Sequence, residues 1–177
     1  MIMNGNNAAG KSNVALIGFM CTGKTSVGRV LSKKLGKRFI EADALIARHA
    51  LKSIRRIFAE DGEIGFMKHE MDVMKGIARH RNSVVSCGGG IIYNKINIDR
   101  LRESSTIILL VASAPEILRR AKRSGIVRPR LRGKSPEEVQ RLIRFRMPLY
   151  RAYADIVVST DGLSVKEVAG RISSRLR

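Results

Sequence analysis

The chain has 177 residues, of which 44% are apolar, which is enough for a hydrophobic core and excludes a wholly disordered protein. Lys and Arg number 34 against 15 Asp and Glu, so the net charge of +19 favours anionic partners such as nucleotides, phosphorylated metabolites or nucleic acid. The longest apolar run, Ile107 to Ala112, is too short for a membrane span of about 20 residues. Two cysteines make no disulfide framework and the first residues lack a secretory signal, so we expect a cytoplasmic protein with no membrane contact.

Hydrophobic periodicity predicts strands and helices that alternate along the chain. The predicted strands are Asn13–Gly18, Phe39–Ile40, Ser83–Ser86, Thr106–Ala112 and Asp155–Ser159. Between them lie predicted helices at Lys24–Leu35, Ala42–Glu60, Glu63–Arg81, Asn97–Glu103 and from Pro115 to about Lys122, and a capped helix that begins at Ser135. A closing helix begins at Ser164, with a capping box completed by Glu167. Apolar strands alternating with amphipathic helices indicate an α/β fold, with a parallel sheet covered on both faces. We expect residues 1–12 to form a flexible extension and residues 13–177 a single domain.

The pattern of a phosphate-binding loop, G-x-x-x-x-G-K-[ST], occurs twice, at Gly5–Ser12 and at Gly18–Thr25. Such a loop needs a strand before it and a helix after it, and only the second copy has both. In that copy Lys24 is expected to reach the β- and γ-phosphates, while the Thr25 hydroxyl coordinates Mg²⁺. The residues predicted to bind the nucleotide are Gly18, Cys21, Thr22, Gly23, Lys24, Thr25 and Ser26.

Two further segments follow predicted strands, at the sheet edge where ligands bind in α/β proteins. Glu41 and Asp43 could hold magnesium and orient an acceptor hydroxyl; the alternative is that Asp43 only caps a helix. Gly88, Gly89 and Gly90 allow a ligand to approach the backbone closely, unless they form an ordinary loop.

A basic segment separates two of the predicted helices. From Arg119 to Lys134 eight residues are basic and none is acidic. The segment is either a solvated charged face or a loop that faces an anionic ligand.

The phosphate loop, the three glycines, Arg128-Pro129 and Arg146-Met-Pro-Leu-Tyr150 together resemble the shikimate kinase family, over about residues 13 to 172. The resemblance implies a P-loop kinase fold, a five-stranded parallel sheet of order 2-3-1-4-5, and a basic lid at about residues 119–134. It also implies transfer of the γ-phosphate of ATP, with Mg²⁺, to a ring hydroxyl of shikimate.

The resemblance further assigns roles to individual residues. Asp43 would bind the acceptor hydroxyls, Arg146 the shikimate carboxylate, and Arg128 in the lid the phosphates. Gly88, Gly89 and Gly90 would form the edge of the shikimate pocket, Arg120 would stack on adenine, and Ser86 would lie near the magnesium waters beside Thr25 and Glu41. Transfer would be in line: Lys24, Arg128 and magnesium would stabilise the charge, and Asp43 would take the hydroxyl proton.

Three positions depart from the family pattern. Glu41 replaces an aspartate, Cys21 replaces a small residue, and Met67 replaces an arginine that shares the substrate carboxylate with the one at Arg146. Met67 donates no hydrogen bond, and the adjacent Lys68 lies about 100° further round the helix, so it substitutes only if the helix turns or its side chain curls back.

These departures leave alternatives to a shikimate kinase. One is a kinase of the same fold that acts on another hydroxylated acid. The other is a nucleotide-binding module whose basic surface binds nucleic acid or a protein, although 5 Phe, 3 Tyr and no Trp offer little stacking surface. We expect a monomer that binds a small hydroxyacid, with only non-specific binding of nucleic acid.

Overall fold

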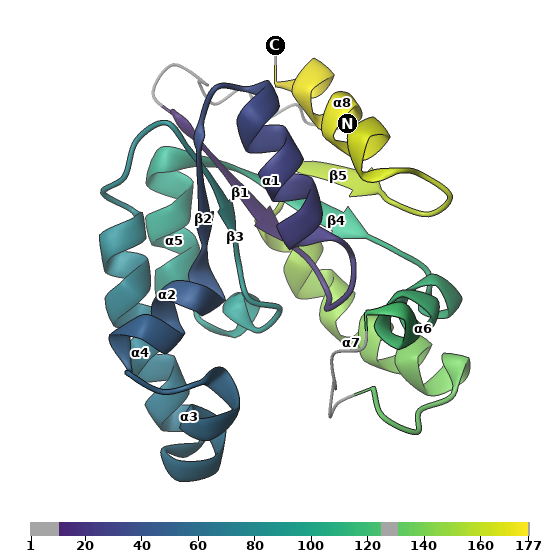
Figure 1. Cartoon of the computed structure of the whole chain (residues 1–177), viewed down its shortest axis with the longest axis horizontal. Helices are drawn as coiled ribbons and strands as arrows, with labels where there is room; N and C mark the ends of the chain where they lie inside the picture. The colour runs from purple at the N-terminus through teal and green to yellow at the C-terminus, as the bar shows by residue number, and fades with distance from the viewer. Residues whose placement is uncertain (1–10, 125–130, 177) are drawn as a thin grey trace.

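A five-stranded parallel sheet, ordered β2-β3-β1-β4-β5, organises the computed structural model (Figure 1). The structure describes residues 11–124 and 131–176. The strands are β1 Asn13–Ile17, β2 Arg38–Glu41, β3 Ser83–Ser86, β4 Ser105–Val111 and β5 Ile156–Ser159. The predicted α/β fold and strand order are confirmed.

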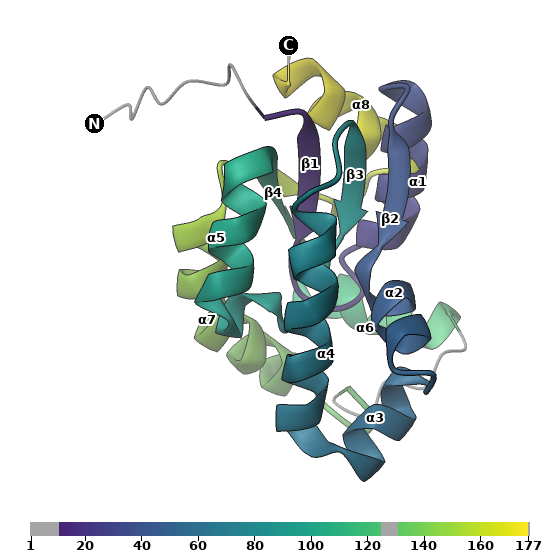
Figure 2. The same cartoon turned by 90° about the vertical axis from the view of Figure 1, so that its left-hand side faces the viewer.

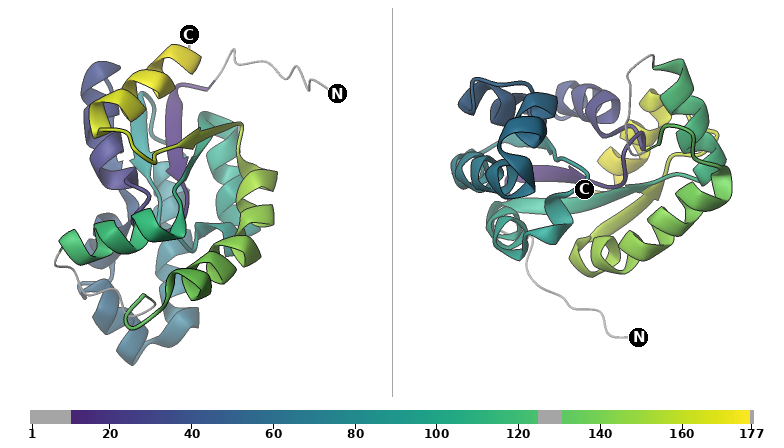
Figure 3. Two further views of the ribbon diagram at one scale, coloured as in Figure 1. Left: turned by 90° about the vertical axis from the view of Figure 1, so that its right-hand side faces the viewer. Right: turned by 90° about the horizontal axis from the view of Figure 1, so that it is seen from below.

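Helices cover both faces of this sheet. They are α1 Lys24–Lys34, α2 Ala42–His49, α3 Ile54–Glu60, α4 Gly62–Ile77, α5 Lys95–Ser104, α6 Ala114–Arg123, α7 Pro136–Tyr153 and α8 Val165–Arg175, with a 3₁₀ turn η1 at Ile91–Tyr93. Helices α1 and α8 lie on one face, and α4, α5 and α7 lie on the other (Figures 2 and 3). Among the described residues no helix is long and apolar enough to cross a membrane.

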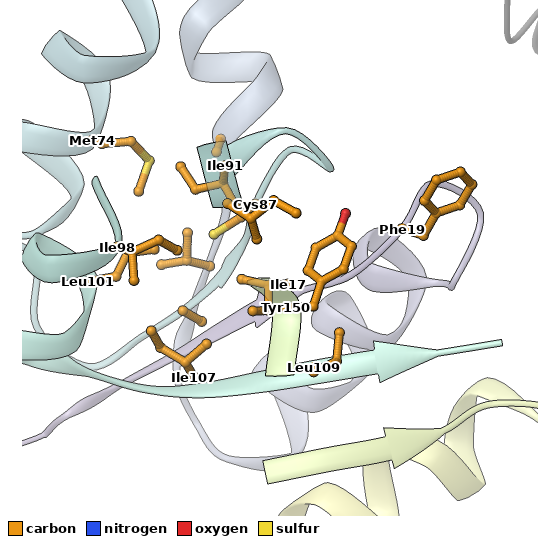
Figure 4. Close-up of a cluster of buried hydrophobic side chains, with 14 of the residues drawn as sticks. Ile17, Phe19, Met74, Cys87, Ile91, Ile98, Leu101, Ile107, Leu109 and Tyr150 are labelled. Carbon is orange, nitrogen blue, oxygen red and sulfur yellow. The ribbon is translucent and has the colours of Figure 1, made fainter. Parts of the chain in front are cut away.

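The two faces of the sheet carry separate apolar cores, because successive side chains of a strand point to opposite faces. In β1, Val14 and Leu16 pack in the core beneath α1 and α8, whereas Ala15 and Ile17 belong to the opposite core. Figure 4 shows this opposite core, where Ile98, Leu101, Ile107, Leu109 and Tyr150 gather from α5, β4 and α7.

Two helix starts follow the predicted capping chemistry. The hydroxyls of Ser135 and Ser164 each accept a hydrogen bond from the backbone N–H of the residue three positions later, and the carboxylates of Glu138 and Glu167 accept from the backbone N–H of Ser135 and Ser164. Each capping box thus supplies hydrogen-bond acceptors to two backbone amides at the start of its helix, which helical hydrogen bonds would leave without partners.

Several helix boundaries differ from the sequence predictions. The predicted helix at Ala42–Glu60 is two helices, because Leu51 adopts a φ of 52° and Ser53 caps a new start. The predicted helix at Glu63–Arg81 ends at Ile77, and Asn82 has a φ of 55°.

The starts and ends of three further helices can also be compared with the predictions. Asn94 caps α5, which therefore begins two residues before the predicted Asn97. Helix α7 runs through Pro148 to Tyr153. Residues 119–123 of the expected lid form the end of α6, as the helix predicted to about Lys122 implies.

Candidate active site

A cavity of about 770 Å³ opens at the carboxyl ends of the central strands. The loop after β1, the ends of β2 and β3, helix α6 and the segment after β5 contribute its walls. The predicted site residues that line it are Cys21, Thr22, Gly23, Lys24, Thr25, Ser26, Glu41, Asp43, Ser86, Gly88, Gly89 and Arg120. Its volume lies in the range of ligand sites in proteins.

The loop between β1 and α1 has the geometry of a phosphate-binding loop. Gly18 has a φ of 143°, and a Cβ there would lie 2.3 Å from the Leu110 carbonyl oxygen, so only glycine fits without a shift of backbone. Gly23 has a φ of 97° and precedes α1, whose first turn holds no acidic residue. The amides at this helix start are therefore available to an anion.

Lys24 is the half-buried cation of this loop. Its Nζ donates hydrogen bonds to the carbonyl oxygens of Gly18 at 2.8 Å and Phe19 at 2.9 Å. Burial lowers the pKa of Lys24 to about 8, although the nearby carboxylates of Asp43 and Glu41 act to raise it.

The first copy of the motif lies elsewhere. Its described residues, Lys11 and Ser12, precede β1 and so lie at the opposite end of the sheet from the cavity. Lys11 pairs with Asp155 at 3.7 Å, and the Ser12 carbonyl accepts a 2.6 Å hydrogen bond from Lys37 Nζ. Gly5 to Gly10 lie outside the described residues.

Glu41 and Asp43 follow β2 at the cavity wall. Glu41 Oε1 accepts a 2.9 Å hydrogen bond from Ser86 Oγ, whereas the buried Oε2 has no hydrogen-bond partner among the described residues. A carboxylate oxygen of this kind beside the Thr25 and Ser86 hydroxyls fits a divalent cation such as Mg²⁺, which takes oxygen ligands. Glu41 occupies the N-cap position of α2, so the interpretation of Asp43 as the helix cap is wrong.

The glycine segment after β3 lies directly against Asp43. A Cβ on Gly88 would lie 2.7 Å from Asp43 Oδ1. The Gly89 carbonyl accepts a 2.6 Å hydrogen bond from the Tyr150 hydroxyl, whose pKa burial raises to about 12. These contacts fix the glycine backbone beside the Asp43 carboxylate; Gly90 follows outside the cavity lining, before η1.

Arg146 and Lys68 differ in their placement. Arg146 lies on α7, is 7% exposed, and its Nε is buried without a hydrogen-bond partner among the described residues. Lys68 is exposed on α4 and does not line the cavity, whereas Met67 is half-buried. Neither Arg146 nor Lys68 lines the cavity, although Arg146 is buried and Lys68 is not. Arg128 lies outside the described residues.

Arg120 connects three walls of the cavity. Its guanidinium donates to Glu116 at 2.6 Å, to Thr160 Oγ1 at 2.9 Å and to the Thr160 carbonyl at 2.8 Å, with a longer bond of 3.3 Å to the Cys21 carbonyl. Hydrogen bonds from Arg119 and Arg120 lower the pKa of Glu116 to about 2. Neither Glu116 nor Thr160 was predicted from the sequence to lie at the site. The position of Thr160 directly after the last predicted strand could have indicated that it lies at the edge of the sheet where ligands bind.

Glu70 is a second buried carboxyl that the sequence analysis missed. It is 3% exposed on α4 and accepts a 3.2 Å hydrogen bond from Asn97 Nδ2. Burial and the charge of Asp43 raise the pKa of Glu70 to about 7, which the Asn97 hydrogen bond partly opposes.

Substitution of the two motif lysines distinguishes the two loops. We expect Lys24→Ala to lower phosphoryl transfer at least about 100-fold, since it removes the charge that faces the β- and γ-phosphates. Lys11→Ala, the matched control, should stay within about twofold because Lys11 contacts only surface groups. Steady-state kinetics measures both, and equal losses would contradict the assignment of the loop.

The depressed pKa of Lys24 predicts a pH dependence of nucleotide binding. Bound phosphates favour the charged ammonium, so affinity is full below about pH 8 and falls as the pH rises above it. Titration calorimetry with ATP should give about tenfold weaker binding near pH 9 than near pH 7. In Lys24→Arg the charge persists, so a dependence of the same size in that variant would assign the effect to another group.

Comparisons with known proteins agree with this geometry. A family model described as shikimate kinase matches residues 20–177. A shikimate kinase of Dehalococcoides mccartyi is 38% identical over 167 residues, which cover 94% of each chain.

Solved structures give the same result. The shikimate kinase of Acinetobacter baumannii in complex with shikimate has a TM-score of 0.85 at 30% identity, covering 94% of this chain and 93% of that one. The shikimate kinase of Aquifex aeolicus has a TM-score of 0.79 at 32% identity, covering 93% of this chain and 95% of that one. The match of the family model and the identity to these relatives show that the chain belongs to the shikimate kinase family.

Proposed function

We propose that this chain transfers the γ-phosphoryl group of ATP to a ring hydroxyl of shikimate. The observation that carries the proposal is the meeting of the Lys24 ammonium and the Asp43 carboxylate in one cavity, with the backbone of Gly88 directly against Asp43. A phosphate-binding cation and a hydroxyl-binding carboxylate are the two groups that a small-molecule kinase must hold close together.

The nucleotide would bind along the loop from Gly18 to Ser26. The loop amides and the start of α1 would surround its phosphates, and Lys24 would exchange the Gly18 and Phe19 carbonyls for phosphate oxygens. Its adenine would lie against Arg120, whose hydrogen bonds to Thr160 hold the guanidinium in place.

Magnesium would be held by Thr25, Glu41 and Ser86, whose oxygens include the unpartnered Glu41 Oε2. When bound, the ion neutralises charge on the β- and γ-phosphates.

Acceptor binding would place the reacting hydroxyl at Asp43. That carboxylate orients the hydroxyl and accepts its proton as the phosphoryl group transfers in line. The backbone at Gly88, Gly89 and Gly90 forms the pocket edge, and Arg146 binds the acceptor carboxylate with a guanidinium that lacks a carboxylate partner among the described residues.

The basic segment at residues 119–134 would close over the nucleotide. Arg119, Arg120 and Arg123 of α6 already line the cavity. Closure would bring the positive charge of Arg128 to the phosphates and exclude water, which would otherwise compete with the acceptor.

A kinase of this fold with another hydroxylated acid as acceptor is the second candidate. Met67 is the observation that favours it, because a methionine cannot bind a carboxylate and the neighbouring Lys68 is exposed outside the cavity.

Replacement of Asp43 tests its role in the transfer. We expect Asp43→Asn to lower kcat at least about 100-fold, because the amide still accepts a hydrogen bond but cannot take a proton. ATP affinity should change little. Asp99→Asn, which alters an exposed carboxylate on α5, is the control, and full activity of Asp43→Asn would remove Asp43 from the mechanism.

An acceptor screen separates the two candidate functions. ATP consumption is measured with shikimate, quinate, gluconate and no acceptor, for the native chain and for Met67→Arg. We expect turnover of shikimate with a high KM that Met67→Arg lowers by about 10-fold or more, with kcat changing less, since an added charge-assisted bond binds ground and transition states alike. Lys68→Ala should leave this KM unchanged. Efficient turnover of another acid, with shikimate inert in both proteins, would favour the second candidate.

The expected monomer and the non-specific binding of nucleic acid stay predictions. The +19 charge supports the latter, because such binding is electrostatic and weakens steeply with salt.

A further inference from the structure

Two aromatic rings contact the guanidinium of Arg146. Its Cζ lies 5.3 Å from the ring centroid of Phe19 and 5.4 Å from that of Tyr93. Both distances are within the range of cation–π attraction. The rings come from the two segments that would hold the two substrates, since Phe19 is in the phosphate loop and Tyr93 follows the three glycines.

The two rings differ in their surroundings. Phe19 is 4% exposed and belongs to the apolar core beneath the loop, as Figure 4 shows. Tyr93 is 44% exposed, although Ile91 and Ile92 of the same 3₁₀ turn are each 1% exposed. Those two isoleucines anchor the turn, so the Tyr93 ring is held at the surface over Arg146 instead of serving the core.

Arg146 depends on such support because its contact with the neutral Tyr150 hydroxyl does not balance its charge. It is 7% exposed, its Nε is buried without a hydrogen-bond partner, and no carboxylate of the described residues pairs with it. A buried cation of this kind is stabilised by aromatic faces, which attract charge without occupying the N–H donors. The buried Nε donor therefore stays available for a carboxylate.

From this geometry we infer that Tyr93 is a positioning residue that determines how tightly the acceptor carboxylate is bound. The inference rests on the proposed function of Arg146. The Tyr93 ring fixes the guanidinium against Phe19 and shields the ion pair from water. With Met67 in place of a second cation, this fixed orientation sets the affinity for a carboxylate.

The test compares substitutions of Tyr93 in steady-state assays of the whole chain. Tyr93→Ala and Tyr93→Leu should raise the KM for shikimate about 3- to 30-fold, with kcat within about threefold and the KM for ATP unchanged. Tyr93→Phe should stay within about twofold of the native KM, because the ring and not the hydroxyl contacts the guanidinium. Ile96→Ala, which truncates another exposed apolar side chain, is the matched control.

A second measurement links the effect to the carboxylate. The carboxamide of shikimate, which lacks the charge, should show the same KM in the native chain and in Tyr93→Ala. A KM for shikimate within twofold of native in Tyr93→Ala, a native KM in Tyr93→Leu, or an equal penalty with the carboxamide would each overturn the inference.

The native chain serves as the reference that separates the two proposals. If it does not phosphorylate shikimate, the proposed function fails, and the same variants are assayed with the carboxylic acid that it does phosphorylate. Turnover of shikimate with no effect of Tyr93→Ala contradicts only the inference.

Discussion

The site depends on the hydrogen bonds that hold the half-buried ammonium of Lys24 against two backbone carbonyls. A buried cation is costly unless oxygen atoms surround it, and the carbonyls of Gly18 and Phe19 supply them before any nucleotide arrives. Those carbonyls can point at Nζ only because the chain turns sharply at Gly18, against the Leu110 backbone of β4. The charge of Lys24, the shape of the loop and the packing of the loop on β4 therefore depend on one another. Phosphate oxygens can take the place of the two carbonyls beside Nζ without a rearrangement of the loop.

Two buried polar atoms of opposite character lack hydrogen-bond partners among the described residues. Glu41 Oε2 is a carboxylate oxygen without a hydrogen-bond partner among the described residues, and Arg146 Nε is a donor in the same situation. Leaving such groups unpaired costs free energy, and a ligand that pairs with them recovers it. A cation is suited to pair with Glu41 Oε2, and a carboxylate is suited to pair with Arg146 Nε. In the proposed function these two atoms would therefore distinguish ligands by charge, and Asp43, close to Gly88, would hold the acceptor hydroxyl.

Local chemistry made most of the fold predictable, whereas contacts between distant segments were not. The loop at Gly18–Thr25 and the capping boxes at Ser135 and Ser164 are complete within eight residues, so the sequence alone predicts them. The break at Leu51 was missed because a non-glycine residue adopts positive φ there. The placement of Tyr93 against Arg146 joins segments more than fifty positions apart, and no periodicity encodes it.

Met67 lies on the same helix as Glu70, a buried carboxyl whose protonation affects the stability of the fold. Glu70, three residues further along α4, is buried and has no ion pair with any residue that the structure describes, and its pKa of about 7 exceeds the ordinary value of 4.5. The folded chain thus binds more protons than the unfolded chain between these values, so the free energy of unfolding falls as the pH rises through this range. An arginine at position 67 could reach Glu70, since positions three apart share a helix face. Without such an arginine, burial and the charge of Asp43 keep the pKa of Glu70 high. In the proposed function, Arg146 with its aromatic contacts would then bind the acceptor carboxylate without a second cation.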